Sequence, residues 1–203
     1  LLPRTPALAL AVAAAAMLAG IARRPILALG LAVAGMPLMN PVSVASGATL
    51  GGTGTVGGNT TCLEVRLSDG RLIVIDGGSG LRELGVSLER RADPVRHIPI
   101  LFSHFHWDHL QGIPFFGPAW VKGNRITFLS PDPRIEKVIR AQMRPPYFPV
   151  TMDAMQARLD FVPLKKAPVR IGRAEVSWMR MNHPGGSFAY RIREGGKSLV
   201  FAT

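Results

Sequence analysis

The sequence contains a single cysteine, Cys62, among 203 residues. One thiol cannot form an internal disulfide, so the fold is not held by cross-links, and a zinc site built from cysteines is excluded. We interpret Cys62 as a core residue, because it begins the alternating apolar and polar stretch "CLEVRL" that is typical of a half-buried strand. The lack of disulfides does not by itself indicate a cellular compartment.

Acidic residues are absent from residues 1–48, which are rich in Ala and Leu. Two apolar runs, residues 7–22 and 26–39, flank Arg23 and Arg24, and each is shorter than the roughly 20 residues that span a bilayer. Three interpretations stay open: a secretory signal peptide, a membrane anchor formed by about residues 1–40, and sequence upstream of the true start. The first two predict an exported or membrane-associated protein, and the third predicts a cytoplasmic one.

Negative charge is scarce in the rest of the chain as well. The sequence has 13 acidic residues against 24 Lys and Arg, which gives a net charge of +11. Such an excess favours anionic substrates such as phosphate esters or RNA, although a solvated basic surface is an equally good explanation. A run of basic residues interleaved with aromatics is missing, so a dedicated nucleic-acid surface is not evident. We therefore expect a small or nucleotide-like anionic substrate, and the oligomeric state stays open.

Residues 50–203 have the mixture of apolar strand-like runs and helical patterns that is typical of one globular α/β domain. "Asp-Gly" at Asp69–Gly70 predicts a hairpin turn between two strands. Helices are expected at residues 77–91, 132–143 and 151–159, and after a turn in residues 109–116. The helix at residues 132–143 would have Asp132 as its cap and Pro133 in its first position. Apolar runs and alternation predict strands at residues 62–67, 71–76, 97–103, 124–130, 174–181, 187–192 and 198–202, with "EGGK" as the last turn.

The stretch "SHFHWDH" contains three of the five histidines in the sequence. Because side chains at i and i+2 of an extended segment point the same way, His104 and His106 project together and Phe105 faces the core. Asp108 and His109 follow the strand end and can turn toward a second point nearby. Three imidazoles and a carboxylate suit zinc, with iron or manganese as alternatives.

"HFHWDH" matches the H-x-H-x-D-H signature, and residues 51–203 resemble the metallo-β-lactamase superfamily. "LIVIDGGSGLRELG" and "MNHPGG" are similar to two further motifs of that family. The surrounding "GGNTTCLEV" and "PPYFPV" are similar to its phosphodiesterase-like branch, which includes tRNA 3′-processing ribonuclease and cyclic-phosphate phosphodiesterases. The resemblance implies an α/β fold, namely a four-layer αββα sandwich of two mixed sheets with helices outside.

The resemblance also implies a set of site residues. His104, His106 and His183 would bind one metal, and Asp108 and His109 would bind a second. Asp76 would lie behind the cluster and hydrogen-bond a ligand or its neighbouring backbone. Plainer interpretations are a turn residue in "Asp-Gly-Gly" for Asp76 and a loop histidine before proline for His183. His97 matches no motif and is interpreted as a surface or strand-edge residue.

One departure from the family concerns the second metal. In the family, a strand similar to "SLVFAT" is followed by an aspartate that bridges two zinc ions and later by another histidine, whereas this sequence stops at Thr203. We therefore expect the chain to be an excerpt of a longer protein, with the sandwich incomplete at its C-terminus. The complete site would hold two zinc ions, and this chain would hold them poorly.

The function implied by the resemblance is zinc-dependent hydrolysis, and charge and motif context favour a phosphodiester cleaved by a metal-bound hydroxide. Asp108 would be the catalytic side chain that orients the water or passes on its proton. Hydrolysis of a thioester, lactone or β-lactam, and a non-catalytic metal-binding module, are the alternatives. In "RPPYFPV", Arg144 could meet a phosphate and Tyr147 and Phe148 could stack on a base, or the stretch could be a packed connector.

Overall fold

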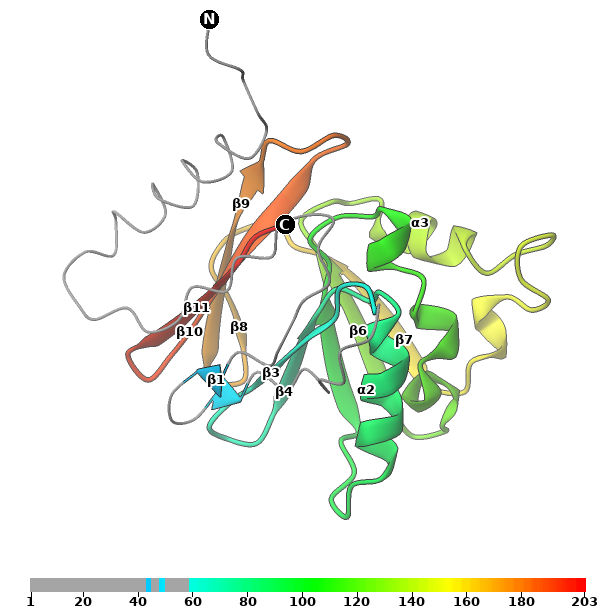
Figure 1. Cartoon of the computed structure of the whole chain (residues 1–203), viewed down its shortest axis with the longest axis horizontal. Helices are drawn as coiled ribbons and strands as arrows, with labels where there is room; N and C mark the ends of the chain where they lie inside the picture. Colours follow the sequence, from blue (N-terminus) through cyan, green and yellow to red (C-terminus); the bar gives the residue numbers. More distant parts are fainter. Residues whose placement is uncertain (1–42, 45–47, 50–58) are drawn as a thin grey trace, which may run out of the picture.

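The computed structural model describes residues 43–44, 48–49 and 59–203 (Figure 1). The short strands β1 (Ser43–Val44) and β2 (Ala48–Thr49) pair antiparallel. Nearly all of the segment for which a signal, an anchor or upstream sequence was considered lies outside the described residues. Among the residues that are described, no helix combines the length and hydropathy that crossing a bilayer requires.

The first sheet has five strands in the order β3-β4-β5-β6-β7. Strand β3 (Leu63–Arg66) runs antiparallel to β4 (Leu72–Ile75), whereas β5 (His97–Leu101), β6 (Arg125–Ser130) and β7 (Arg158–Pro163) follow β4 in parallel. The hairpin at Asp69–Gly70 is confirmed: Gly70 has a φ of 82°, and its amide donates to the Leu67 carbonyl oxygen at 3.0 Å.

The second sheet has the strand order β11-β10-β9-β8 and is antiparallel throughout. Its strands are β8 (Val169–Ile171), β9 (Ala174–Met181), β10 (Ser187–Glu194) and β11 (Lys197–Phe201). The expectation of two mixed sheets is therefore wrong for this one. The predicted "EGGK" turn is confirmed, because Gly195 and Gly196 join β10 to β11 with positive φ angles of 54° and 80°.

Two apolar cores divide the described residues into a helical layer and two sheets (Figure 1). Helix α2 (Gly80–Glu89) buries Leu81, Leu84 and Leu88, which share one helix face, and α3 (Ile135–Ala141) buries Ile135 and Ile139. Both helices pack on the outer face of the first sheet, and the second core fills the space between the sheets. Residues 59–203 thus supply three of the four expected layers, and they place no helix outside the second sheet.

The segment at residues 151–159 is not the helix that was expected. It forms only a short 3-10 turn, η4 (Met152–Ala154), and the chain then enters β7 at Arg158. Leu159 and Phe161 pack against the helix-side core, and β7 pairs with β6 along six residues. Pairing and burial along β7 outweigh the helical propensity of "DAMQARL".

Two other helix predictions need correction. Helix α3 begins at Ile135 rather than at Pro133, because the Asp132 carboxylate accepts a hydrogen bond from the Arg134 amide and closes a turn there. After the histidine cluster the chain forms three short 3-10 turns, η1 (Trp107–His109), η2 (Ile113–Phe115) and η3 (Gly117–Trp120), in place of a helix. Pro114 and Pro118 lack the amide hydrogens that an α-helix needs.

Tyr190 on β10 links the second sheet to the end of β5. Its side chain is fully buried, and its hydroxyl donates to the Phe102 carbonyl oxygen at 2.7 Å. Ser130 Oγ donates to the same carbonyl at 3.2 Å, so this acceptor keeps a partner if the tyrosine hydroxyl is removed. The bond lies one residue before the segment that carries the histidine cluster.

We expect Tyr190→Phe to lower the free energy of unfolding by about 1 kcal/mol, the net value of a buried hydrogen bond whose acceptor stays satisfied. Urea denaturation followed by circular dichroism measures the change. Tyr147→Phe is the matched control, because Tyr147 is 77% exposed, and its effect should stay within about 0.5 kcal/mol. Equal stability of Tyr190→Phe and the parent chain would contradict the role given to the hydroxyl.

A candidate metal centre

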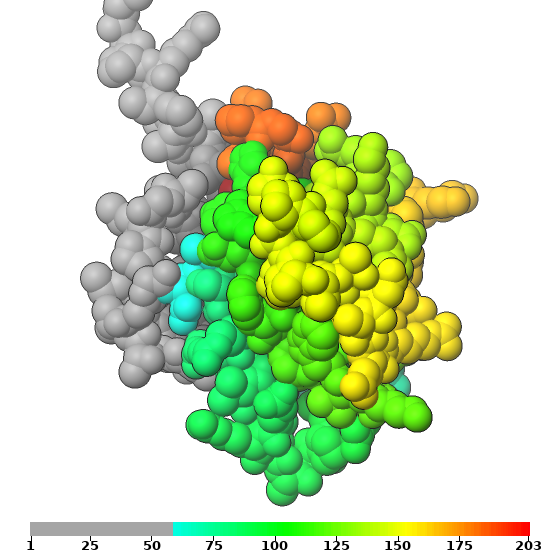
Figure 2. Space-filling view, turned by 90° about the vertical axis from the view of Figure 1, so that its right-hand side faces the viewer, coloured from blue at the N-terminus to red at the C-terminus, as the bar shows by residue number. Residues whose placement is uncertain are grey.

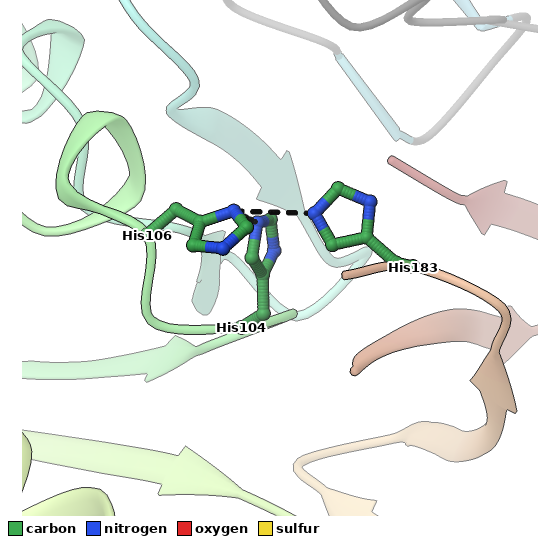
Figure 3. A group of neighbouring side chains, drawn as sticks. All are labelled: His104, His106 and His183. Carbon is green, nitrogen blue, oxygen red and sulfur yellow. Dashed lines mark hydrogen bonds between the residues drawn. The ribbon is translucent and has the colours of Figure 1, made fainter. Parts of the chain in front are cut away.

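Three histidines from two distant segments point toward one another beside the ends of both sheets (Figure 3). His104 and His106 follow β5, and His183 lies in the loop between β9 and β10. The amide of Phe188 donates to the Ser103 carbonyl oxygen at 2.8 Å, which joins β10 to the segment that carries His104. This contact places His183, from the second sheet, beside the histidines that follow the first sheet.

The ring nitrogens of this group lie close enough to share one ion. His106 Nδ1 is 3.0 Å from His104 Nε2 and 3.2 Å from His183 Nε2, and all three atoms lie within 4.8 Å of one another. Zinc bonds to imidazole nitrogen of about 2.0–2.1 Å in a tetrahedron separate neighbouring ligands by about 3.3 Å. The donor set therefore fits a tetrahedral ion that keeps one position open.

Asp76 lies behind the histidines and is fully buried. Its Oδ1 accepts a hydrogen bond from the Ser103 amide at 2.7 Å. Its Oδ2 accepts from Ser103 Oγ and from His109 Nδ1, both at 2.7 Å. The predicted position of Asp76 behind the cluster agrees with these contacts, and its φ of 62° shows that it is a turn residue as well.

The bonds to Asp76 decide which ring nitrogens are free. Because Ser103 Oγ donates to Asp76, it accepts from His104 Nδ1 at 3.0 Å, and the lone pair of His104 Nε2 faces the other two histidines. In the same way His109 donates through Nδ1 and leaves Nε2 free, 3.4 Å from Asp108 Oδ2. No role was predicted for Ser103. The one feature of the sequence that could have indicated its role is its position between the strand and the first histidine.

The charges of the cluster differ from residue to residue. Burial, followed by the neighbouring charges of His109, His183 and His106, lowers the pKa of His104 to about 3, so this ring is neutral at pH 7. Burial also lowers the pKa of His183. Burial disfavours the charged form of His109 too, but the hydrogen bond and charge of Asp76 outweigh it and raise the pKa of His109.

Asp108 and His109 lie beside the three-histidine group, where the second metal was expected. The ring centroids of His109 and His104 are 4.0 Å apart, and the Asp108 side chain is 55% exposed. Within the described part of the chain, the converging ligand atoms belong to His104, His106 and His183 alone. The structure thus brings all five predicted ligands together, and their binding of metal stays a proposal.

Two glycines let the loop after β4 pack directly on the loop that carries Asp108. A Cβ on Gly78 would lie 2.3 Å from the Asp108 carbonyl oxygen, and a Cβ on Gly112 would lie 2.0 Å from the Gly78 carbonyl oxygen. The Gly77 amide also donates to the His109 carbonyl oxygen at 2.8 Å. Gly78 and Gly112 are therefore required by close backbone contact.

A pocket of about 280 Å³ opens beside the metal centre. Its wall includes His104 and His106 and continues along Asp132, Arg134, Val138, Gly185, Gly186 and Phe188. Neither Asp132 nor Arg134 was predicted as a site residue, because no motif singles them out. They reach the pocket because the loop after β6 ends beside the loop after β5.

The stretch "RPPYFPV" supplies no wall residue of this pocket. The segment around residue 150, drawn in yellow in Figure 2, lies on the surface of the molecule. Phe148 packs on Phe115 with ring centroids 6.1 Å apart, and Arg144 is exposed. The substrate contacts assigned to Arg144, Tyr147 and Phe148 stay predictions.

The two remaining candidate residues lie apart from the reacting groups. Cys62 is partly buried against the helix-side core, and burial raises the pKa of its thiol, which agrees with its interpretation as a core residue. His97 begins β5, at the opposite end of that strand from His104, and its Nε2 hydrogen-bonds Thr127 Oγ1 at 2.9 Å.

Comparison with known proteins supports the same fold and family. The sequence model of the Metallo-beta-lactamase superfamily matches residues 55–126. The chain is 29% identical over 127 residues to Ribonuclease Z of Clostridium kluyveri, an alignment that covers 61% of this chain and 40% of that protein. It therefore spans well under half the length of this curated relative.

Two solved structures share the fold. YhfI from Bacillus subtilis, a metallo-beta-lactamase fold protein, superposes with a TM-score of 0.53 at 19% identity, covering 76% of this chain and 58% of that one. A diphosphatase from the PhnP family superposes with a TM-score of 0.50 at 18% identity, covering 66% and 49%. The chain thus has the metallo-β-lactamase fold, which implies binding of divalent metal, and its residues 55–126 are similar to the superfamily of that name.

We expect Asp76→Asn to weaken zinc binding about 10- to 100-fold, because the amide cannot accept from both Ser103 Oγ and His109 at the buried Oδ2 position. Competition with a chromophoric chelator measures the affinity. Asp69→Asn in the exposed hairpin is the control and should bind zinc like the parent chain. An unchanged affinity in folded Asp76→Asn would mean that the carboxylate does not orient the ligands.

Proposed function

We propose that this chain is the metal-binding part of a zinc-dependent hydrolase that cleaves a phosphodiester. The observation that carries the proposal is the convergence of His104, His106 and His183, with Asp108 and His109 beside them, at the mouth of a pocket that contains a guanidinium group. The similarity to a ribonuclease and to the fold of a diphosphatase supports phosphate over other substrates.

His104, His106 and His183 would hold one zinc ion, and Asp108 and His109 would contribute to a second. The chemistry that divalent ions would supply there is a lowered pKa of a water molecule and compensation of the negative charge on phosphoryl oxygens. The protein's part is to keep the ring nitrogens free and correctly oriented, which Ser103 and Asp76 do through the hydrogen bonds described above.

Asp108 is the proposed catalytic side chain. It is half exposed and lies 3.4 Å from His109 Nε2. A carboxylate in that position orients the attacking water, accepts its proton and passes it to the leaving oxygen. Ser103 and Cys62 are not needed as nucleophiles, because Ser103 is engaged with Asp76 and Cys62 packs against the helix-side core.

A phosphorylated substrate also suits the charge of the chain. The net charge of +11 attracts anions at long range, and Arg134 in the pocket wall supplies a planar cation at short range. We accordingly propose a nucleotide-like or RNA substrate, with residues 50–203 as the extent of the domain that acts on it.

We expect His106→Ala to lose most bound zinc and all detectable turnover while the chain stays folded, because His106 Nδ1 lies between the other two ligand nitrogens. Metal analysis and hydrolysis of bis(p-nitrophenyl) phosphate give the two readouts. His97→Ala is the matched control, since this histidine lies at the other end of β5. Normal zinc content in His106→Ala would remove the basis of the proposal.

Substrate class is tested by comparing bis(p-nitrophenyl) phosphate with nitrocefin as substrates of the zinc-loaded protein. We expect release of nitrophenolate and no opening of the lactam ring, because the chain is similar to a ribonuclease and shares the fold of a diphosphatase. Turnover of nitrocefin alone would replace the phosphodiesterase with a carbon-centred hydrolase. Turnover of neither would favour a non-catalytic metal-binding module.

A further inference from the structure

The pocket beside the metal centre has a second, charged end. Asp132 and Arg134 follow β6 and line the same pocket as His104 and His106. Neither residue belongs to the group of converging ligand atoms, so this end of the pocket has no part in holding the metal. The charged side chains at this end of the pocket therefore act either on the substrate or in stabilising the local fold.

Asp132 holds the Arg134 guanidinium in one orientation. Arg134 Nε donates to Oδ1 at 3.0 Å and to Oδ2 at 3.1 Å, and Nη2 donates to Oδ2 at 2.6 Å. The backbone amide of Arg134 donates to Oδ1 at 2.9 Å. These bonds use one edge of the guanidinium, and Nη1 takes no part in them. The side chain is 63% exposed, so its other edge is open to a ligand.

A second guanidinium approaches the same place from the other sheet. Arg180 on β9 lies against the pocket-lining Gly186, where a Cβ would be 3.5 Å from Arg180 Nη2. The hydrogen bond of Arg134 chiefly, and the positive charge of Arg180 in addition, lower the pKa of Asp132. Two cations around one anion leave the end of the pocket with a net positive charge.

Bare backbone separates this charged end from the metal centre. Gly185 and Gly186 have positive φ angles of 80° and 83° and line the pocket. Around the position of a Cβ on Gly185, the one atom within 4 Å is His106 Nε2, at 3.7 Å. A ligand can therefore extend from the histidines past Gly185 without meeting a further side chain, and next reaches the part of the wall where Arg180 lies against Gly186. Val138 and Phe188 add apolar surface on which a sugar could rest.

We propose that the Arg134 end of the pocket binds a second phosphate group of the substrate, while the scissile phosphate lies at the metal centre. The proposal rests on the proposed function and narrows it to substrates with two phosphates on one nucleotide unit, such as an internal nucleotide of RNA or an end that carries a further phosphate. At about 280 Å³, the pocket is near the lower end of ligand sites and suits one such unit. Asp132 is a positioning residue that orients Arg134.

The proposal is tested by titrating the zinc-loaded full chain with thymidine 3′,5′-bisphosphate and with the thymidine 5′- and 3′-monophosphates in a calorimeter. We expect the bisphosphate to bind about tenfold more tightly than either monophosphate, since a charge-assisted pair adds to its binding. Arg134→Gln should abolish this advantage and leave the monophosphate affinities within about twofold of the parent values. Equal binding of all three ligands by the parent chain would overturn the proposal.

Arg158→Gln is the matched control. Arg158 is an exposed arginine that is also hydrogen-bonded to an aspartate two residues away, Asp160, but it begins β7 at the opposite end of the sheet. The bisphosphate advantage should persist in this variant, and its loss there would mean that general surface charge, rather than a subsite, binds the second phosphate.

Asp132→Asn separates orientation from charge. Removal of the carboxylate makes the pocket more positive. If Asp132 acted through its charge alone, the variant would bind the bisphosphate more tightly, and that result would overturn the positioning role of Asp132. We expect weaker binding, because the guanidinium loses its fixed orientation. All of these readouts are affinities. If the protein prefers the bisphosphate but has no turnover, the phosphodiesterase proposal is wrong and the subsite proposal stands. If the protein turns over substrate but does not prefer the bisphosphate, only the subsite proposal is wrong.

Discussion

The carboxylate of Asp76 is the group on which the site depends. A buried carboxylate is costly unless its oxygens are hydrogen-bonded, and Asp76 accepts from the Ser103 amide, the Ser103 hydroxyl and His109 Nδ1. Because Asp76 follows β4 and Ser103 lies just after β5, these bonds fix the ends of two parallel strands relative to each other. The same bonds direct the free nitrogens of His104 and His109 toward the open side of the site.

The second sheet completes this arrangement. Its contribution to the metal centre is His183, and the loop that carries it is positioned by contacts to residues just before His104, namely Phe188 to Ser103 and Tyr190 to Phe102. The sheets therefore meet through backbone hydrogen bonds at the site and through apolar packing elsewhere. Metal would add a third link between the sheets, so zinc binding and the stability of this junction should be coupled.

The parts of the fold that could be predicted are those with a local signal. The strands around Asp76 and His104 have short apolar runs, and the histidine spacing indicated side chains that the structure brings close together, although their binding of metal stays a proposal. The helix expected at residues 151–159 failed because pairing of β7 with β6 is a tertiary effect that propensity does not contain. Arg134 and Arg180 were missed because they lie 46 residues apart in the sequence, one after β6 and the other on β9, and no local signal indicates that both lie beside the same pocket.

The candidate metal ligands and the residues proposed to select the substrate lie on different loops. In the proposed function, a metal ion held by the histidines would activate water for attack on phosphorus or on carbon alike, so the metal ligands would not discriminate between these substrates. The loop after β6 supplies no member of the converging ligand group, yet it lines the same pocket. Changes at Asp132 and Arg134 can therefore alter which anion binds without disturbing the histidines. Specificity in this protein is best sought in the loop after β6, and the metal-dependent step in the loop after β5.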